Sequence, residues 1–168
     1  LCKVPYDPKL MVYTVCDPGD VVFSLVYFQL HGKEIRIIDA EEFYSPSMEH
    51  IYTQIIQKPY KYAKHFLPFD ASVTQLATGM SIIAQLRKLG LKDIYSGPDG
   101  DGLPQQSSKM EGIKLVQSAF YGIWIDESLE KKVLEPLSNY APKFSETRHT
   151  YSSEPEHNWA SHMSDAIR

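Results

Sequence analysis

An apolar run near the N-terminus constrains the fold more than any other feature of the sequence. The segment VVFSLVYFQL, residues 21 to 30, is nearly all apolar and rich in Val, Tyr and Phe, residues that are typical of β-strands. A strand with one face in solvent would alternate apolar and polar residues, and this run does not. It therefore predicts a strand covered on both faces, as when helices pack on either side of a sheet.

Two further strand-like segments flank this run. MVYTVCD (11–17) precedes it, EIRIIDAEE (34–42) follows it, and the turn sequences PGD and HGK separate the three. Apolar and β-branched residues bounded by turn residues are the usual signature of strands joined by tight turns. We therefore predict a three-stranded antiparallel meander at the start of the chain.

Helical and strand-like segments alternate in the next part of the chain. Ser47 is a suitable cap for the first helix, and Gly90 is a suitable end for the second, which has Leu76 on its apolar face. The segments, in order, are a helix in SPSMEHIYTQIIQ (45–57), a strand in HFLPFD (65–70), a helix in TQLATGMSIIAQLRKLG (74–90) and a strand in KDIYSG (92–97).

The last third begins with a loop, GPDGDGLPQQSS (97–108), that is crowded with turn-forming residues. Two amphipathic helices should follow on either side of IWID, and Pro136 should kink or end the second of them. Residues 141–156 fit either a hairpin or an ordered loop, and a final helix should start near Asn158. This order of elements predicts an α/β, ribonuclease-H-like mixed sheet, in which an antiparallel three-strand meander and parallel strands are flanked by helices.

Composition limits the class of protein. A chain of 168 residues with 43% hydrophobic residues is long enough for one domain with a real core, here 1–168. It has no apolar run of about 18 residues and no basic-then-apolar leader, so we expect a cytosolic protein with no membrane contact. It lacks an initial methionine, which suggests a fragment of a larger protein. The net charge of -4 argues against nonspecific coating of nucleic acid.

Three aspartates are the candidates for chemistry. If the strands at 11–17 and 65–70 are parallel neighbours, Asp17 and Asp70 emerge side by side at the sheet edge where open α/β sheets bind ligands. Two such carboxylates require either a shared proton or a divalent cation. Asp165, on a helix packed against this edge, would complete an oxygen-rich site for Mg²⁺ or Mn²⁺. Two such ions can activate water and stabilise the leaving oxygen of a phosphodiester.

Each of these residues also has a purely structural interpretation. Asp17 before Pro-Gly and Asp70 before Ala-Ser are both consistent with ordinary turn chemistry. Asp165 can pair with Arg168 on the surface of its helix. His162 lies three residues before Asp165, on the same helix face, and is equally consistent with a half-buried structural histidine.

Other charged residues are weaker candidates. Lys58, Lys61 and Lys64 alternate with aromatic residues in KPYKYAKHF, a pattern that suits nucleic acid or an ordinary solvated connection. The cluster Asp39, Glu41 and Glu42 belongs to the third strand of the meander, away from the first and fourth, so we expect it to be solvated. Asp99 and Asp101 resemble a calcium loop only weakly. The two cysteines, Cys2 and Cys16, are expected to be reduced.

The order and spacing of several segments resemble a known family. They are YTVCDPGD, HFLPFDAS, MEGIKLVQSAF followed by WIDE and LEPLSNY, and the closing HNWASHMSDAIR. Together they resemble the C-terminal nuclease domain of the large terminase subunit of tailed bacteriophages, from about Val12 to Arg168. The sequence contains no GxxxxGK[ST] phosphate loop, no zinc spacing and no Gly-x-Ser-x-Gly elbow.

This resemblance implies a ribonuclease-H-like endonuclease that uses two ions, Mg²⁺ or Mn²⁺, to cut concatemeric double-stranded phage DNA. By position, Asp17, Asp70 and Asp165 resemble the metal-binding acids, His162 resembles a histidine beside the metals, and Asp20 an auxiliary acid. The implied partners are double-stranded DNA, an ATPase motor domain that is absent from this fragment, the small terminase subunit and the portal ring. The implied location is the cytoplasm of the infected bacterial host.

Two other functions compete with this interpretation. One is a docking or DNA-binding module on the same fold, in which the acids only stabilise the structure. The other is a nuclease resembling a Holliday-junction resolvase, which would share the metal site and prefer branched DNA.

Overall fold

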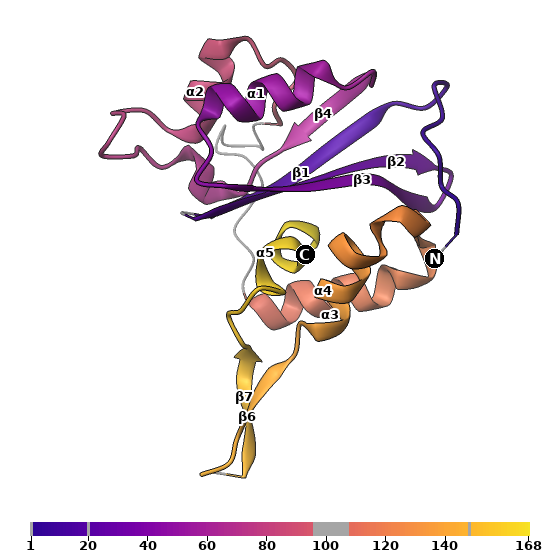
Figure 1. Ribbon diagram of the computed structural model, residues 1–168, viewed down its shortest axis with the longest axis vertical. Coiled ribbons are helices and arrows are strands. Elements are labelled where there is room, and N and C mark those ends of the chain that lie inside the picture. The colour runs from indigo at the N-terminus through magenta and orange to yellow at the C-terminus, as the bar shows by residue number, and fades with distance from the viewer. Residues whose placement is uncertain (1, 20, 96–107, 148) are drawn as a thin grey trace.

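The computed structural model describes residues 2–19, 21–95, 108–147 and 149–168. Within these residues, a mixed sheet of five strands lies between two layers of helices (Figure 1). The strands are β1 (Val12–Pro18), β2 (Val22–His31), β3 (Glu34–Tyr44), β4 (Tyr62–Phe66) and β5 (Ile123–Ile125), with a separate pair, β6 (Pro142–Ser145) and β7 (Thr150–Pro155). The α-helices are α1 (Met48–Gln57), α2 (Ile82–Leu89), α3 (Lys109–Ala119), α4 (Glu135–Asn139) and α5 (Ser161–Ile167).

The strand order in the sheet is β4-β1-β2-β3-β5. β1, β2 and β3 are antiparallel neighbours, whereas β4 runs parallel to β1 and β5 runs parallel to β3. The crossover from β3 to β4 contains the helix α1, as is usual between parallel strands, and it carries the chain past β2 and β1 to place β4 on the far side of β1. This arrangement confirms the predicted ribonuclease-H-like sheet, with its antiparallel meander and parallel flanking strands.

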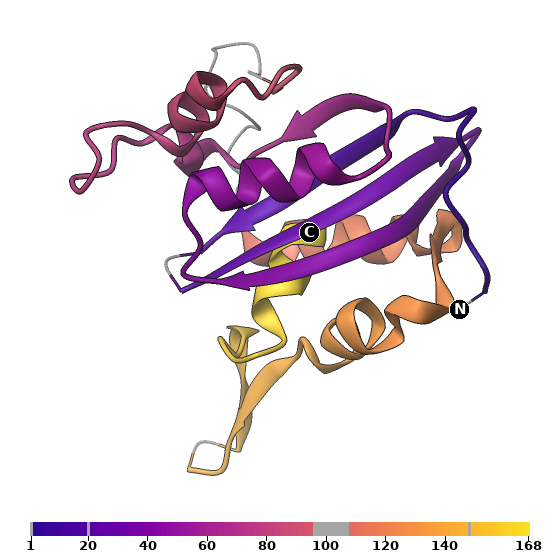
Figure 2. The same ribbon diagram turned by 45° about the horizontal axis from the view of Figure 1, so that its top comes forward.

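The central strand, β2, is buried on both faces. All residues from Val22 to Tyr27 are buried. Phe23, Leu25 and Tyr27 belong to a core shared with α1 and α2. Val26 belongs to a second core, shared with the helices between residues 127 and 139 and with α5. Figure 2 shows α1 on one side of the sheet and α5 on the other. The unbroken apolar run therefore exists because both faces of this strand are covered.

The structure corrects three local predictions. The strand predicted at 65–70 is shifted to β4, and Asp70 lies in a 3₁₀ helix, η1 (Phe69–Ser72). The second helix starts only at α2, where Ser81 caps the amide of Ala84, and Leu76 is fully exposed. The segment 92–95 forms a single parallel bridge to β4 rather than a strand, while residues 96–97 lie outside the described chain.

The helical segment after β5 is irregular. It runs through a 3₁₀ turn η3 (Glu127–Leu129), a π-helical turn η4 (Glu130–Leu134) and then α4, and a second 3₁₀ turn, η2 (Phe120–Gly122), follows α3. Pro136 lies in the first turn of α4, directly after the π-helical turn, and it has no N–H to donate to the carbonyl groups of that turn. We expected this proline to kink or end the helix. Instead, the helix changes from π to α geometry near Pro136 and continues to Asn139.

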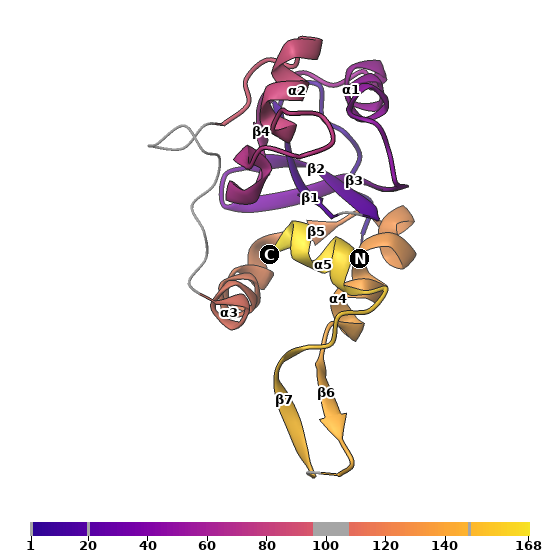
Figure 3. The ribbon, with the colours of Figure 1, turned by 90° about the vertical axis from the view of Figure 1, so that its left-hand side faces the viewer.

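Residues 141–156 form the hairpin that the sequence left as one of two possibilities. β6 and β7 pair in antiparallel fashion and project from the body of the protein (Figure 3). The chain then turns at Asn158, whose side chain accepts a hydrogen bond from the amide of Ala160. α5 follows and packs on β1 and β2. Its buried residues are Met163, which belongs to the second core, and three residues with small side chains, Ser161, Ser164 and Ala166.

Both cysteines have free thiols, as predicted. Cys16 is buried in β1, and its thiol donates a weak hydrogen bond of 3.8 Å to the carbonyl oxygen of Phe66. This contact ties β1 to the end of β4 beside the residues considered next.

Candidate metal centre

Asp17 occupies the C-terminal end of β1, where it lies opposite Ser24 of β2. Burial raises the pKa of this carboxyl group from 3.8 to about 6, and the negative charges of Asp165 and Asp70 contribute to that rise. The positive charges of Arg168 and Lys109 act in the opposite direction. Two other acids therefore lie within electrostatic reach of Asp17, which makes its ionised form unfavourable.

Asp70 reaches the same edge of the sheet from the neighbouring strand. β4 is parallel to β1, with Phe66 opposite Val15, so the two strands end at the same edge. Asp70 lies beyond that end, as an exposed residue of the 3₁₀ helix η1. Its negative charge also helps to raise the pKa of the Cys16 thiol, after burial and the charge of Asp17. The predicted juxtaposition of the two strand ends is present, although Asp70 itself comes from a turn.

Asp165 lies on α5, the helix that packs on β1 and β2. Its Oδ1 atom accepts a hydrogen bond of 2.6 Å from the hydroxyl of Tyr140 and one of 3.1 Å from Nε of Arg168. The pairing with Arg168 that the sequence left open is therefore formed. It is not a contact on the open surface, because the side chains of Arg168 and Asp165 are only 17% and 13% exposed.

His162 lies half-buried one helical turn before Asp165. Its ring meets the ring of His157 edge to face, with 5.4 Å between the centroids. The hydrogen-bond partners that the structure describes for Asp165 are Tyr140 and Arg168, not His162. The imidazole thus lies one helical turn from Asp165, and the hydrogen bonds described for this carboxylate come from other residues.

The chemistry of these acids fits a divalent cation. Carboxylate oxygens are the ligands that Mg²⁺ and Mn²⁺ prefer, and a cation would favour the ionised form of Asp17 that burial and its neighbours disfavour. Among the described residues, no three side chains of His, Cys, Asp or Glu lie close enough to hold a metal ion as they stand. At least one of the three aspartates would therefore have to move before all three could hold the same ion. Asp20, Asp99 and Asp101 lie outside the described residues.

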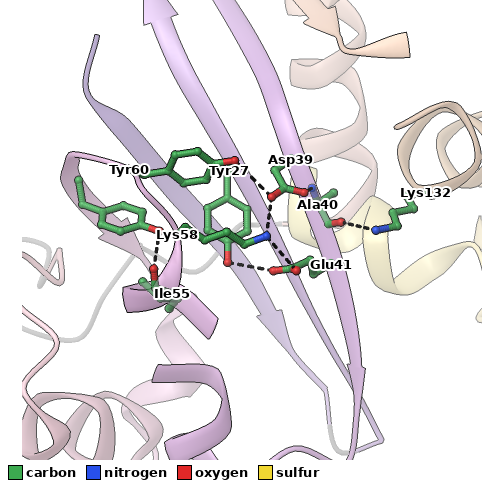
Figure 4. A network of polar contacts seen from close by, with 9 residues as sticks. Tyr27, Asp39, Ala40, Glu41, Ile55, Lys58, Tyr60 and Lys132 are labelled. Atoms are coloured by element: carbon green, nitrogen blue, oxygen red, sulfur yellow. Dashed lines mark hydrogen bonds and ion pairs between the residues drawn. The ribbon is translucent and has the colours of Figure 1, made fainter. Parts of the chain in front are cut away.

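Two acids on β3, Asp39 and Glu41, share the positive charge of one lysine. The ammonium group of Lys58 lies 2.6 Å from Oδ2 of Asp39 and 3.0 Å from Oε1 of Glu41, and Tyr27 and Tyr60 donate hydrogen bonds to the same carboxylates (Figure 4). Burial opposes the charge of Lys58, but its hydrogen bonds to Asp39 and Glu41 raise its pKa above the ordinary value. We expected Asp39, Glu41 and Glu42 to be solvated. Asp39 and Glu41 instead form a partly buried ion-pair network, whereas Glu42 is exposed and accepts a hydrogen bond from Ser24.

The three candidate DNA-binding lysines therefore differ. The charge of Lys58 is used within the protein. Lys61, just before β4, and Lys64, within it, are exposed, and the ammonium group of Lys64 lies 5.3 Å from the centroid of the Tyr95 ring. Of the three, only Lys61 and Lys64 have the exposure that a contact with phosphate would require.

Sequence reasoning missed Tyr140 and Lys109. Tyr140 is 25 residues from the aspartate that it contacts, and no local motif joins the two. Lys109 is the first residue of α3, and its charge acts on Asp17 from a distant part of the chain. The only signal in the sequence was indirect. A partly buried carboxylate needs hydrogen-bond donors or positive charges nearby, but the sequence does not identify which residues supply them.

No helix in the described part of the chain is both long enough and apolar enough to cross a membrane. This finding agrees with the absence of a long apolar run in the sequence.

Comparisons with solved structures reveal the fold. The large terminase of a thermophilic bacteriophage, in complex with ATP-γ-S, matches with a TM-score of 0.69 and 15% identity, covering 99% of this chain and 40% of that one. The large terminase nuclease of thermophilic phage G20c with bound magnesium matches with a TM-score of 0.65 and 13% identity, covering 99% and 89%. The large terminase nuclease domain of bacteriophage SPP1 with bound Mn matches with a TM-score of 0.62 and 14% identity, covering 93% and 82%.

The resemblance seen in the sequence is therefore confirmed at the level of the fold, which is that of large terminase nuclease domains. The chain spans 40% of the length of the large terminase that was solved with ATP-γ-S. No protein-family model matches the sequence, and no curated protein matches it either.

Proposed function

We propose that this chain is the metal-dependent endonuclease domain of a phage DNA-packaging terminase, and that it cuts concatemeric double-stranded DNA. The fold supports the assignment to terminase nucleases, and one observation in the site supports the dependence on metal. Asp17 is a half-buried carboxyl group whose pKa burial and the charges of Asp165 and Asp70 raise to about 6. A site that disfavours its own negative charge in this way is suited to a divalent cation.

The three aspartates would be the metal ligands. Asp17, the most central, would bridge two Mg²⁺ or Mn²⁺ ions, and Asp70 and Asp165 would each hold one. The bound ions would activate a water molecule and stabilise the oxygen that leaves the phosphodiester. His162 would orient a water molecule or a ligand beside them, and the exposed Lys61 and Lys64 would contact DNA phosphates.

The comparisons support this proposal through the proteins they name. The G20c nuclease binds magnesium and the SPP1 nuclease domain binds Mn. By analogy, we propose that residues 1–168 form the nuclease domain of a longer protein that also has an ATPase motor. Its partners would be the small terminase subunit and the portal ring, in the cytoplasm of an infected bacterium.

Substitution of Asp17 by Asn tests the proposal. Cleavage of plasmid DNA in Mn²⁺ should fall by at least about 100-fold, because a neutral amide cannot bridge two cations. The matched control is Glu127→Gln, which neutralises an exposed acid in η3, on the strand-β5 side of the molecule. It should cut at the wild-type rate. Wild-type cleavage by Asp17→Asn would refute the assignment.

The same experiment separates the competing functions. A docking module would show neither cleavage nor a rise in melting temperature with Mn²⁺, and the present separation of the acids within the described chain is the one observation that favours it. A resolvase-like nuclease would cut branched DNA in preference to linear DNA, whereas the proposed enzyme cuts linear duplexes.

A further inference from the structure

The carboxylate of Asp165 is held by one of its two oxygens. Tyr140 and Arg168 both donate to Oδ1, at 2.6 Å and 3.1 Å. Both hydrogen bonds that the described chain gives to this carboxylate therefore end on Oδ1 and not on Oδ2. The contact from Tyr140 is a short hydrogen bond between a hydroxyl group and a charged oxygen, a type that is stronger than a bond between neutral groups.

The position of Tyr140 is set by two elements of the fold. It directly follows α4 and comes just before the β6–β7 hairpin. α4 packs against α5, the helix that carries Asp165. The half-buried ring of Tyr140 has only two side-chain torsions, so the packing of the two helices fixes where its hydroxyl lies.

Tyr140 and Arg168 differ in what they do to an approaching cation. The guanidinium group of Arg168 neutralises Asp165 but would repel a metal ion at the same carboxylate. The hydroxyl of Tyr140 has no charge, so it can orient the carboxylate without this repulsion. Partners that orient a metal ligand in this way govern both the direction and the affinity of the ligand.

We infer that Tyr140 is a positioning residue that fixes Oδ1 of Asp165 and thereby presents Oδ2 to a divalent cation beside Asp17. This inference rests on the proposed function, because it requires the site to bind a metal. It goes further by assigning one oxygen of Asp165 to the protein and the other to the cation.

Tyr140→Phe tests the inference, because it removes the hydroxyl and keeps the ring. The matched control is Tyr62→Phe, which removes a comparable 2.7 Å hydrogen bond, to the carbonyl oxygen of Ile55, on the α1 side of the sheet. The first measurement is melting temperature against Mn²⁺ concentration without DNA, and the second is the rate of plasmid cleavage over the same range of Mn²⁺.

Tyr140→Phe should raise the Mn²⁺ concentration at half-maximal effect by about 10-fold in both measurements. Cleavage should recover towards the wild-type rate at high Mn²⁺, because the ligand itself remains. Tyr62→Phe should lower the melting temperature without moving either midpoint. In the Asp165→Asn background, Tyr140→Phe should cause no further shift in the Mn²⁺ midpoint, since its effect acts through that carboxylate.

The outcomes distinguish this inference from the function on which it rests. If wild-type protein binds Mn²⁺ and cuts DNA while Tyr140→Phe has an unchanged midpoint, the inference is wrong and the proposed function stands. If Tyr140→Phe shifts the midpoint equally with and without Asp165, the hydroxyl does not act through that carboxylate and the inference is also wrong. If the wild type neither binds Mn²⁺ nor cuts, both fail together.

Discussion

Two groups of acids in this protein show how a fold can treat the same chemistry in opposite ways. On β3, Asp39 and Glu41 surround the ammonium group of Lys58 at 2.6 Å and 3.0 Å, so their charges are partly compensated within the chain. At the shared end of β1 and β4, burial and two further acids raise the pKa of Asp17 to about 6. The first group stabilises the fold, whereas in the second the acids disfavour the charge of Asp17, which a bound cation would stabilise.

The largest expected change in stability comes from breaking the compensated group. Lys58→Met should lower the free energy of unfolding by about 3 kcal/mol, because it leaves Asp39 and Glu41 partly buried without their cation. The matched control is Lys61→Met, which removes an exposed lysine next to the same crossover. Urea denaturation at pH 7 measures both variants. Equal, small effects would show that the Lys58 network is only a surface contact.

Asp17, whose ionised form the fold opposes, should respond with the opposite sign. In metal-free buffer at pH 7, Asp17→Asn should increase the free energy of unfolding by about 1–2 kcal/mol, because it removes a carboxylate whose ionisation the fold opposes. Asp39→Asn, in contrast, should decrease stability by weakening the pair with Lys58. If both substitutions destabilise the protein, the contrast between the two groups is wrong.

The stability that Asp17→Asn gains should depend on pH, because the fold raises the pKa of Asp17. The folded-state pKa of Asp17 lies near 6 and its ordinary value is 3.8, so the folded protein binds more protons between these values and stability falls as pH rises. The destabilisation of the wild-type protein by ionised Asp17 is absent below about pH 4 and complete above about pH 6. The difference between Asp17→Asn and wild type, measured by urea denaturation, should therefore shrink to near zero at pH 4.

The smallest expected effect concerns Asp70, the exposed acid of the candidate site. Asp70→Asn should change stability by at most about 0.5 kcal/mol in metal-free buffer, because the side chain is exposed and acts on Asp17 only through its charge. It should still lower the apparent pKa of Asp17, which nuclear magnetic resonance titration of the carboxyl carbon can follow. An unchanged titration of Asp17 would mean that the two carboxyl groups do not interact.

The fold was predictable from the sequence where local patterns and burial agree. The run from 21 to 30 predicted a strand covered on both faces, and residues 22–27 are buried. The predicted helix start failed at Leu76, which has helical spacing yet is exposed. Gly79 has a φ of +65°, which is not helical, and Ser81 caps the start of α2. The backbone preferences of these two residues therefore decided where the helix begins, and the spacing of apolar residues did not.

The candidate site was only partly predictable. Strand ends and the parallel crossover indicated that Asp17 and Asp70 face the same edge. The position of the third strand separated the acids on β3 from those at the edge, but nothing in the sequence indicated that Asp39 and Glu41 pair with Lys58. The counter-charge of an acid depends on which side chains pack beside it, and those neighbours are distant in sequence.

The sequence by itself determined the apolar central strand, the antiparallel meander around it and the order of helices and strands, because these follow from the local alternation of apolar and turn-forming residues. Only the tertiary structure decided that Lys58 compensates Asp39 and Glu41, and that Tyr140 holds one oxygen of Asp165. Such contacts join residues brought together by packing, and their strength depends on distance and burial, which no local pattern encodes.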